Sequence, residues 1–111
     1  MQVTGFRHIG IPTQDMEASV KFYEKCGFVI MSQGVDIING QEIRWKKIKN
    51  DEGNCIELLT SGHFHLAFTV DEVKKDQYYF QTPAGHKVQF GFDPAGVLIE
   101  FVEEYTEEPE P

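Results

Sequence analysis

The sequence has few basic residues and no long apolar run, and each shortage excludes a class of function. Ten lysines and arginines face 18 aspartates and glutamates, which gives a formal net charge of −8 at pH 7. Nucleic acids and anionic membranes repel an acidic surface, so we expect neither as a partner. No apolar stretch approaches the roughly 20 residues of a membrane-spanning helix, and Met1 is followed by polar residues rather than by a secretory leader. These features predict a cytoplasmic protein.

Cysteine is also scarce, because Cys26 and Cys55 are the only two in the chain. A pair of cysteines in a cytosolic protein is usually reduced. Each lies in an apolar periodic segment, so we interpret both as small hydrophobic residues rather than nucleophiles. A length of 111 residues suffices for one domain with a real core but not for two independent domains.

The signals for strands, helices and turns come in the same order twice. The first half predicts a strand, then a helix with Asp15 as its N-cap and Gly27 just past its end, and then three strands. The second half predicts a strand, at most one helical turn over 71–75, and three more strands. The strands expected in the first half are 5–13, 28–34, 42–49 and 55–60, and those in the second are 63–70, 77–82, 86–92 and 97–104.

The ends of the two halves match in sequence, which indicates an internal duplication. The openings are "HIGI", from His8, and "HLAF", from His65, while the closings "IELL" and "IEFV" contain Glu57 and Glu100. The first strand of each half therefore carries a histidine, and the last strand of each half carries a glutamate.

Apolar residues flank each of these four polar side chains, so the strands that carry them are expected to be buried. An unpaired carboxylate removed from water costs several kcal/mol, so two buried glutamates need partners. Two neutral imidazoles and two carboxylates form a ligand set of charge −2, which suits a divalent cation and leaves positions open for water or substrate. The pattern predicts a metal site of His8, Glu57, His65 and Glu100. Taken singly, a histidine or glutamate in such a strand is more often a surface residue. His63, which shares a strand face with His65, is an alternative ligand.

Three stretches resemble the vicinal oxygen chelate superfamily, which includes glyoxalase I, methylmalonyl-CoA epimerase, extradiol dioxygenases and the bleomycin and fosfomycin resistance proteins. They are "HIGIPTQDMEASVKFYEKCGF", "HLAFTVDEV" and "DPAGVLIEFVE". The resemblance implies an α+β fold of two tandem βαβββ modules that form a curved sheet cup, with a much reduced helix in the second module. It implies one domain over 1–105, made of modules 1–60 and 63–105, followed by an acidic tail over 106–111.

The family's four ligand positions fall on His8, Glu57, His65 and Glu100, and this full set is most similar to bacterial-type glyoxalase I. The resemblance therefore implies a metal-dependent isomerase or lyase, with nickel, cobalt or zinc rather than iron or manganese. In that chemistry the cation binds adjacent oxygens of a small substrate, and a glutamate moves a proton at the neighbouring carbon. Glu100 is the favoured base and Glu57 the alternative. The rival functions are a non-catalytic binding or resistance protein and, less favoured, a non-haem iron dioxygenase.

Several further residues are candidates for the wall of the cup. The candidate substrate-binding residues are Arg44, Trp45, Tyr79, Phe90 and Phe92. Arg44 and Lys46 are the expected anchors for an anionic group, although the basic stretch 44–49 is more often a solvated strand edge, and core packing competes for the aromatic residues. Cups in this family are often completed by a second subunit, so a homodimer is expected.

Overall fold

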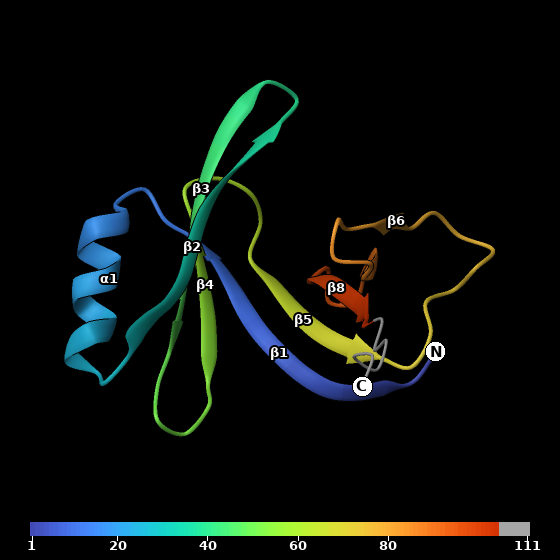
Figure 1. The fold of residues 1–111 in the computed structure, drawn as a ribbon, viewed down its shortest axis with the longest axis horizontal. Helices are drawn as coiled ribbons and strands as arrows, with labels where there is room; N and C mark the ends of the chain where they lie inside the picture. The colour runs from blue at the N-terminus through green and yellow to red at the C-terminus, as the bar shows by residue number, and fades with distance from the viewer. Residues whose placement is uncertain (105–111) are drawn as a thin grey trace, which may run out of the picture. The chain divides into compact units, whose positions relative to one another are not determined.

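The computed structural model describes residues 1–104, which form two compact units (Figure 1). The helical unit comprises His8–His65, and the C-terminal unit comprises Met1–Arg7 together with residues 66–104. In chain order the elements are β1 (Val3–Pro12), α1 (Met16–Lys25), β2 (Val29–Ile38), β3 (Gln41–Lys49), β4 (Cys55–Leu59), β5 (His65–Val70), β6 (Phe80–Gln81), β7 (Lys87–Phe92) and β8 (Leu98–Glu103). The predicted acidic tail lies outside the described residues.

The helical unit is a four-stranded sheet with α1 packed on one face. Its strand order is β2-β3-β4-β1, with β1 parallel to β4 and the other pairs antiparallel. Val20 of α1 packs with Ile48 of β3 and Leu58 of β4 to form the buried core. The Asp15 carboxylate accepts a hydrogen bond from the Ala18 N–H at 3.0 Å, which confirms the predicted N-cap.

A two-residue turn at Asn39 and Gly40 sets the register of β2 against β3. Both residues have positive φ, 51° and 78°, as a hairpin turn of this length requires. The resulting register places Gly34 directly opposite Trp45. A Cβ at Gly34 would lie 2.6 Å from Cζ2 of Trp45, so the indole lies flat against the glycine backbone and only glycine leaves room for it.

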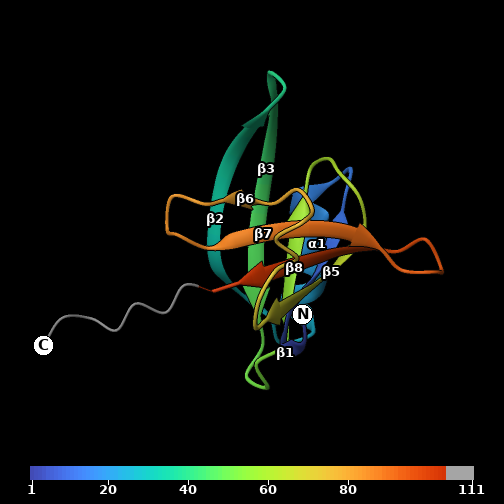
Figure 2. The same ribbon diagram turned by 90° about the vertical axis from the view of Figure 1, so that its right-hand side faces the viewer.

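The C-terminal unit has no helix among its described residues. Its strands β5, β8, β7 and β6 lie in that order beside the start of β1 (Figure 2), and residues 71–79 form a loop where the first module has α1. The α+β class with a single small helix is therefore confirmed, as is the reduction of the second helix. In the described part of the chain, no helix is long and apolar enough to span a membrane.

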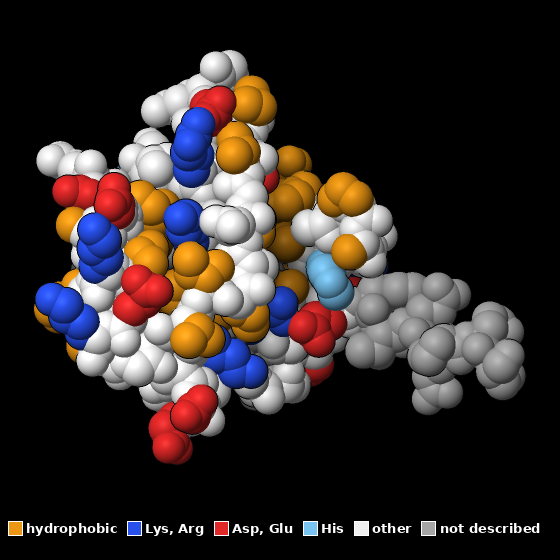
Figure 3. Space-filling view, turned by 60° about the vertical axis from the view of Figure 1, so that its left-hand side comes forward, with side chains coloured by type: hydrophobic (Ala, Val, Ile, Leu, Met, Phe, Trp, Pro, Cys, Tyr) orange, Lys and Arg blue, Asp and Glu red, His pale blue; other side chains and the backbone are white. Residues whose placement is uncertain are grey.

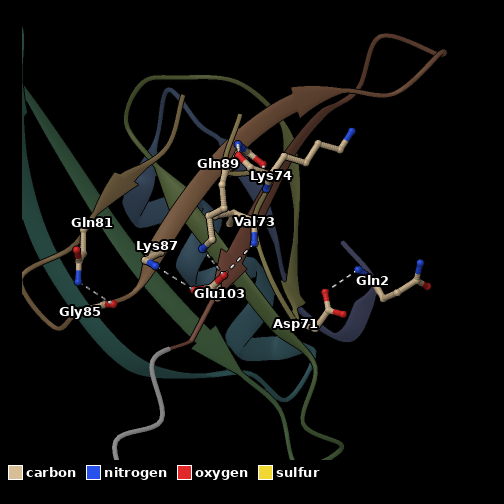
Figure 4. Close-up of polar contacts among 10 residues, drawn as sticks. Gln2, Asp71, Val73, Lys74, Gln81, Gly85, Lys87, Gln89 and Glu103 are labelled. Atoms are coloured by element: carbon tan, nitrogen blue, oxygen red, sulfur yellow. Dashed lines mark hydrogen bonds and ion pairs between the residues drawn. The ribbon is translucent and has the colours of Figure 1, made fainter. Parts of the chain in front are cut away.

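The buried amide of Gln89 holds this loop in place. Its Oε1 accepts from the Lys74 N–H at 2.9 Å, and its Nε2 donates to the carbonyls of Lys74 at 2.9 Å and Tyr78 at 3.2 Å (Figure 4). This contact gives the Tyr78 carbonyl a side-chain partner in place of a strand ladder. The predicted strand over 77–82 was wrong in extent, because only Phe80 and Gln81 pair with β7.

Glu103 fastens the same loop by charge. Its carboxylate accepts from the Val73 N–H at 2.9 Å and from the Lys75 ammonium at 3.1 Å, and Lys87 Nζ lies 3.6 Å away. Burial, the largest single influence, raises the pKa of Glu103. The hydrogen bonds from Lys75 and Val73 and the charges of Lys75 and Lys87 together outweigh it, so the pKa lies below its usual value of 4.5.

We expect acid to weaken this attachment. A carboxylate whose pKa is lowered on folding stabilises the fold above its unfolded pKa, and the contribution disappears as the pH falls through the folded pKa. Urea unfolding from about pH 5 down to pH 3 should show falling stability, and Glu103→Gln should flatten part of that fall. An unchanged pH dependence in Glu103→Gln would contradict the assignment.

The cysteines differ from their predicted environment. Both are free thiols, as expected, but Cys26 is exposed and Cys55 is half-buried. Cys26 caps the C-terminal end of α1, where its N–H bonds the Tyr23 carbonyl at 3.0 Å. Cys26 therefore does not pack as a small hydrophobic residue, because it lies at the exposed C-terminal cap of α1.

Candidate metal centre

The register of the helical unit brings His8, Glu57 and His65 to one face of its sheet. Gly10 of β1 stands opposite Glu57 of β4, and His8 lies two residues before Gly10 on the same face. His65, the first residue of β5, completes the group. The residues that alternate with these side chains along the strands point to the other face. Leu58, next to Glu57 in β4, packs there under α1. The ligand candidates therefore lie on the face that the helix does not cover.

The three side chains form a tight and largely buried group. His8 Nε2 lies 3.3 Å from His65 Nε2, and Glu57 Oε1 lies 3.9 Å from the first and 3.7 Å from the second. Both histidines are buried, and the Glu57 side chain is 15% exposed. Among residues 1–104 this is the one group of three or more histidine, cysteine, aspartate or glutamate side chains whose ligand atoms all lie within 4.8 Å of one another.

Two backbone features fix the His65 ring. Its Nδ1 lies 3.0 Å from the His63 carbonyl oxygen, which accepts a hydrogen bond when Nδ1 carries the proton. In that tautomer the Nε2 lone pair is free of a proton and points at the ligand group. The ring also rests on the Gly10 backbone, where a Cβ would lie 1.9 Å from Cε1. Gly10 thus provides the space for a ligand, while His63 contributes its backbone carbonyl and its own side chain is exposed.

The geometry of this group fits a divalent cation. From the three distances, the circle through the ligand atoms has a radius of about 2.1 Å, which is the usual bond length from such a cation to histidine nitrogen or carboxylate oxygen. Two imidazoles and a carboxylate also form the mixed nitrogen and oxygen donor set that transition metals favour. The residues present therefore fit a metal ion.

The second oxygen of Glu57 faces the ammonium group of Lys47, a residue that the sequence pattern favoured for a solvated strand edge. Lys47 stands opposite Glu57 in the β3–β4 register, and its Nζ lies 4.0 Å from Glu57 Oε2. The same Nζ lies 5.5 Å from the centre of the Trp45 ring. Alternation along β3 is a signal that predicts this position for Lys47. Ile48 lies in the core, so its neighbour Lys47 must point to the opposite face, which is the face of Glu57.

The predicted anchors Arg44 and Lys46 are not brought together with the ligand group. Both line a surface cavity of about 460 Å³ whose other walls are Met16, Glu17, Val20, Lys21 and Glu24 of α1. Arg44 Nε donates to the Glu42 carboxylate at 2.9 Å. On the side of the molecule that carries α1, basic and acidic side chains alternate with hydrophobic ones (Figure 3), and no single charge dominates it.

Glu100 and the remaining aromatic candidates belong to the C-terminal unit. Glu100 of β8 stands opposite Phe90 of β7, and the next pair on the same face is Leu98 and Phe92. Phe90 and Phe92 are 48% and 73% exposed, so this face presents apolar surface around the carboxylate. Tyr79 lies on the other side of that sheet, where the ammonium groups of Lys75 and Lys87 lie 5.4 Å and 5.7 Å from its ring centre.

Comparisons with known proteins identify a family for this chain. The model of the Glyoxalase/Bleomycin resistance protein/Dioxygenase superfamily matches residues 5–101. Among solved structures, the chain is similar to a glyoxalase family protein from Bacillus cereus, with 13% identity, a TM-score of 0.49 and coverage of 96% of this chain and 97% of that one. No curated protein is similar enough to this chain to count as a match.

Proposed function

Since the chain belongs to the glyoxalase/bleomycin resistance protein/dioxygenase superfamily, we propose that it is a metal-dependent isomerase or lyase of the glyoxalase or epimerase type. The observation that carries the proposal is the buried group of His8, Glu57 and His65, with ligand atoms spaced for one cation. Isomerases, lyases and dioxygenases of this superfamily use such a centre, and a fourth ligand, which we propose to be Glu100, would favour the first two.

His8, Glu57 and His65 would hold the cation, with Glu100 as the proposed fourth ligand. A bound nickel, cobalt or zinc ion would act as a Lewis acid on two adjacent oxygens of a small substrate. Glu57 directs Oε1 toward both histidines and Oε2 toward Lys47, so it is arranged to ligate through one oxygen.

Glu100 is the proposed base that removes and returns a proton at the carbon next to those oxygens. Its neighbours on the face, Leu98 and Phe90, are apolar, and a carboxylate is a common general base for such a proton transfer. Phe90 and Phe92 would then contact the apolar part of the substrate. Glu57, held by both histidines and Lys47, is less suited to move.

Deuterium incorporation from D2O tests this function. Cobalt- or nickel-loaded protein would be offered methylglyoxal–glutathione hemithioacetal, methylmalonyl-CoA and small 2-hydroxy ketones, and the exchanged carbon followed by NMR. We expect metal-dependent exchange with at least one of them, and a loss of about a hundredfold or more in Glu100→Gln with the metal retained.

Glu57→Gln is the matched control, because it should lose metal as well as exchange. Metal binding without exchange on any of these substrates would favour the non-catalytic binding protein instead. Oxygen uptake by iron-loaded protein would favour the dioxygenase. A homodimer and a cytoplasmic location also remain predictions, and sedimentation equilibrium would test the first.

A further inference from the structure

The outer oxygen of Glu57 and the ammonium of Lys47 form an ion pair beside the ligand group. At 4.0 Å between Nζ and Oε2 the contact is too long for a hydrogen bond. The N–H donors of Lys47 are therefore not used up by Glu57. The Lys47 side chain is 30% exposed, so a molecule that reaches the ligand face from solvent can meet its ammonium.

The register puts this ammonium in line with the ligands. Lys47 of β3, Glu57 of β4 and Gly10 of β1 are successive partners across the sheet, and the His65 ring lies on Gly10. A positive charge therefore stands one strand away from the carboxylate ligand, on the same face and in the same row. A substrate bound to the cation would have the ammonium beside it.

Trp45 makes the position of the ammonium well defined. Its ring is pressed against Gly34, and Lys47 Nζ lies 5.5 Å from the ring centre. The attraction between a cation and an aromatic face adds to the pull of Glu57. Two independent contacts thus hold a flexible side chain close to the ligand group.

We propose that Lys47 is a substrate-binding residue and that the substrate carries an anionic oxygen group, such as a carboxylate, beyond the two oxygens that reach the cation. This inference rests on the proposed metal centre and names the class of its substrate: small molecules with two adjacent chelating oxygens and one further anionic group. The ammonium, a point charge with three donors, suits such a group.

Two hydroxy acids that differ by one carboxylate test the proposal. Glycolate chelates a metal through its hydroxyl and carboxylate, and tartronate is the same molecule with a second carboxylate. Their dissociation constants would be measured from the visible spectrum of cobalt-loaded protein, with wild type, Lys47→Met and Lys46→Met. Lys46→Met removes the same charge from the side of the sheet that faces α1.

We expect Lys47→Met to weaken tartronate binding about tenfold relative to glycolate, because it removes one charge-assisted hydrogen bond. Lys46→Met should leave the ratio of the tartronate and glycolate dissociation constants unchanged. The affinity of Lys47→Met for cobalt should change far less than this ratio does. An unchanged ratio in Lys47→Met, or an equal fall in Lys46→Met, would overturn this inference alone. Failure of wild-type protein to bind cobalt would instead overturn the proposed metal centre, and this inference with it.

Discussion

Gly10→Ala is expected to abolish tight metal binding while the protein stays folded. A Cβ at this position would overlap the His65 imidazole, with separations of 1.9 to 2.4 Å from three ring atoms. The ring must therefore swing away from His8 and Glu57, whereas alanine itself suits a strand at least as well as glycine. Isothermal titration with nickel or cobalt should show affinity lowered by about a hundredfold or more, the upper range for substitutions that disturb a ligand's support.

Gly5→Ala is the matched control for this prediction. Gly5 lies in the same strand, and a Cβ there would make only an ordinary contact of 3.9 Å with Thr69. Its metal affinity should equal that of wild type, and circular dichroism should show both variants folded. Undiminished affinity in Gly10→Ala would mean that His65 is not a ligand in the position described.

Leu58→Ala is expected to produce the largest loss of stability. The Leu58 side chain is fully buried between Ile48 and Val20 under α1. Its truncation removes apolar contact and leaves a cavity, which costs about 2–5 kcal/mol in the free energy of unfolding. A domain of this size has only about 5–15 kcal/mol in total, so urea unfolding should shift to clearly lower denaturant concentration.

Val29→Ala provides the comparison for Leu58→Ala. Val29 is 65% exposed at the edge strand β2, and surface substitutions usually change stability by less than about 0.5 kcal/mol. The cobalt affinity of folded Leu58→Ala should match wild type, because Leu58 and the ligands lie on opposite faces. Equal stability losses in the two variants would contradict the assignment of the core.

Strand alternation and the repeat were sufficient to single out the three residues that the structure brings into one group. His8 and His65 open matched strands, and Glu57 lies in a closing strand, so local pattern alone placed them in buried sheet positions. Their mutual distances depend on which residues stand opposite one another, and this register is a long-range property. The Lys47–Glu57 pair follows from the register of β3 against β4, which the turn between Asn50 and Asn54 closes.

The same limit explains the error in the loop and the position of the candidate anchors. An aromatic run at 77–82 favours a strand locally, but the buried amide of Gln89 bonds the backbone of Lys74 and Tyr78 instead. Alternation separates Arg44 and Lys46 from Trp45 and Lys47, yet it does not say which pair shares a face with the ligands. Knowing that Ile48 is in the core resolves that choice.

The metal content of the untagged protein is the decisive test of the proposed metal centre. Wild type, His65→Ala and Glu57→Gln would be incubated with nickel, cobalt, zinc, iron or manganese, passed through gel filtration and analysed by mass spectrometry of the elements. We predict about one tightly held ion per chain in wild type, with nickel, cobalt or zinc preferred, and almost none in either variant. A wild-type protein that retains none of the five ions, or a His65→Ala variant that retains as much as wild type, would contradict the account.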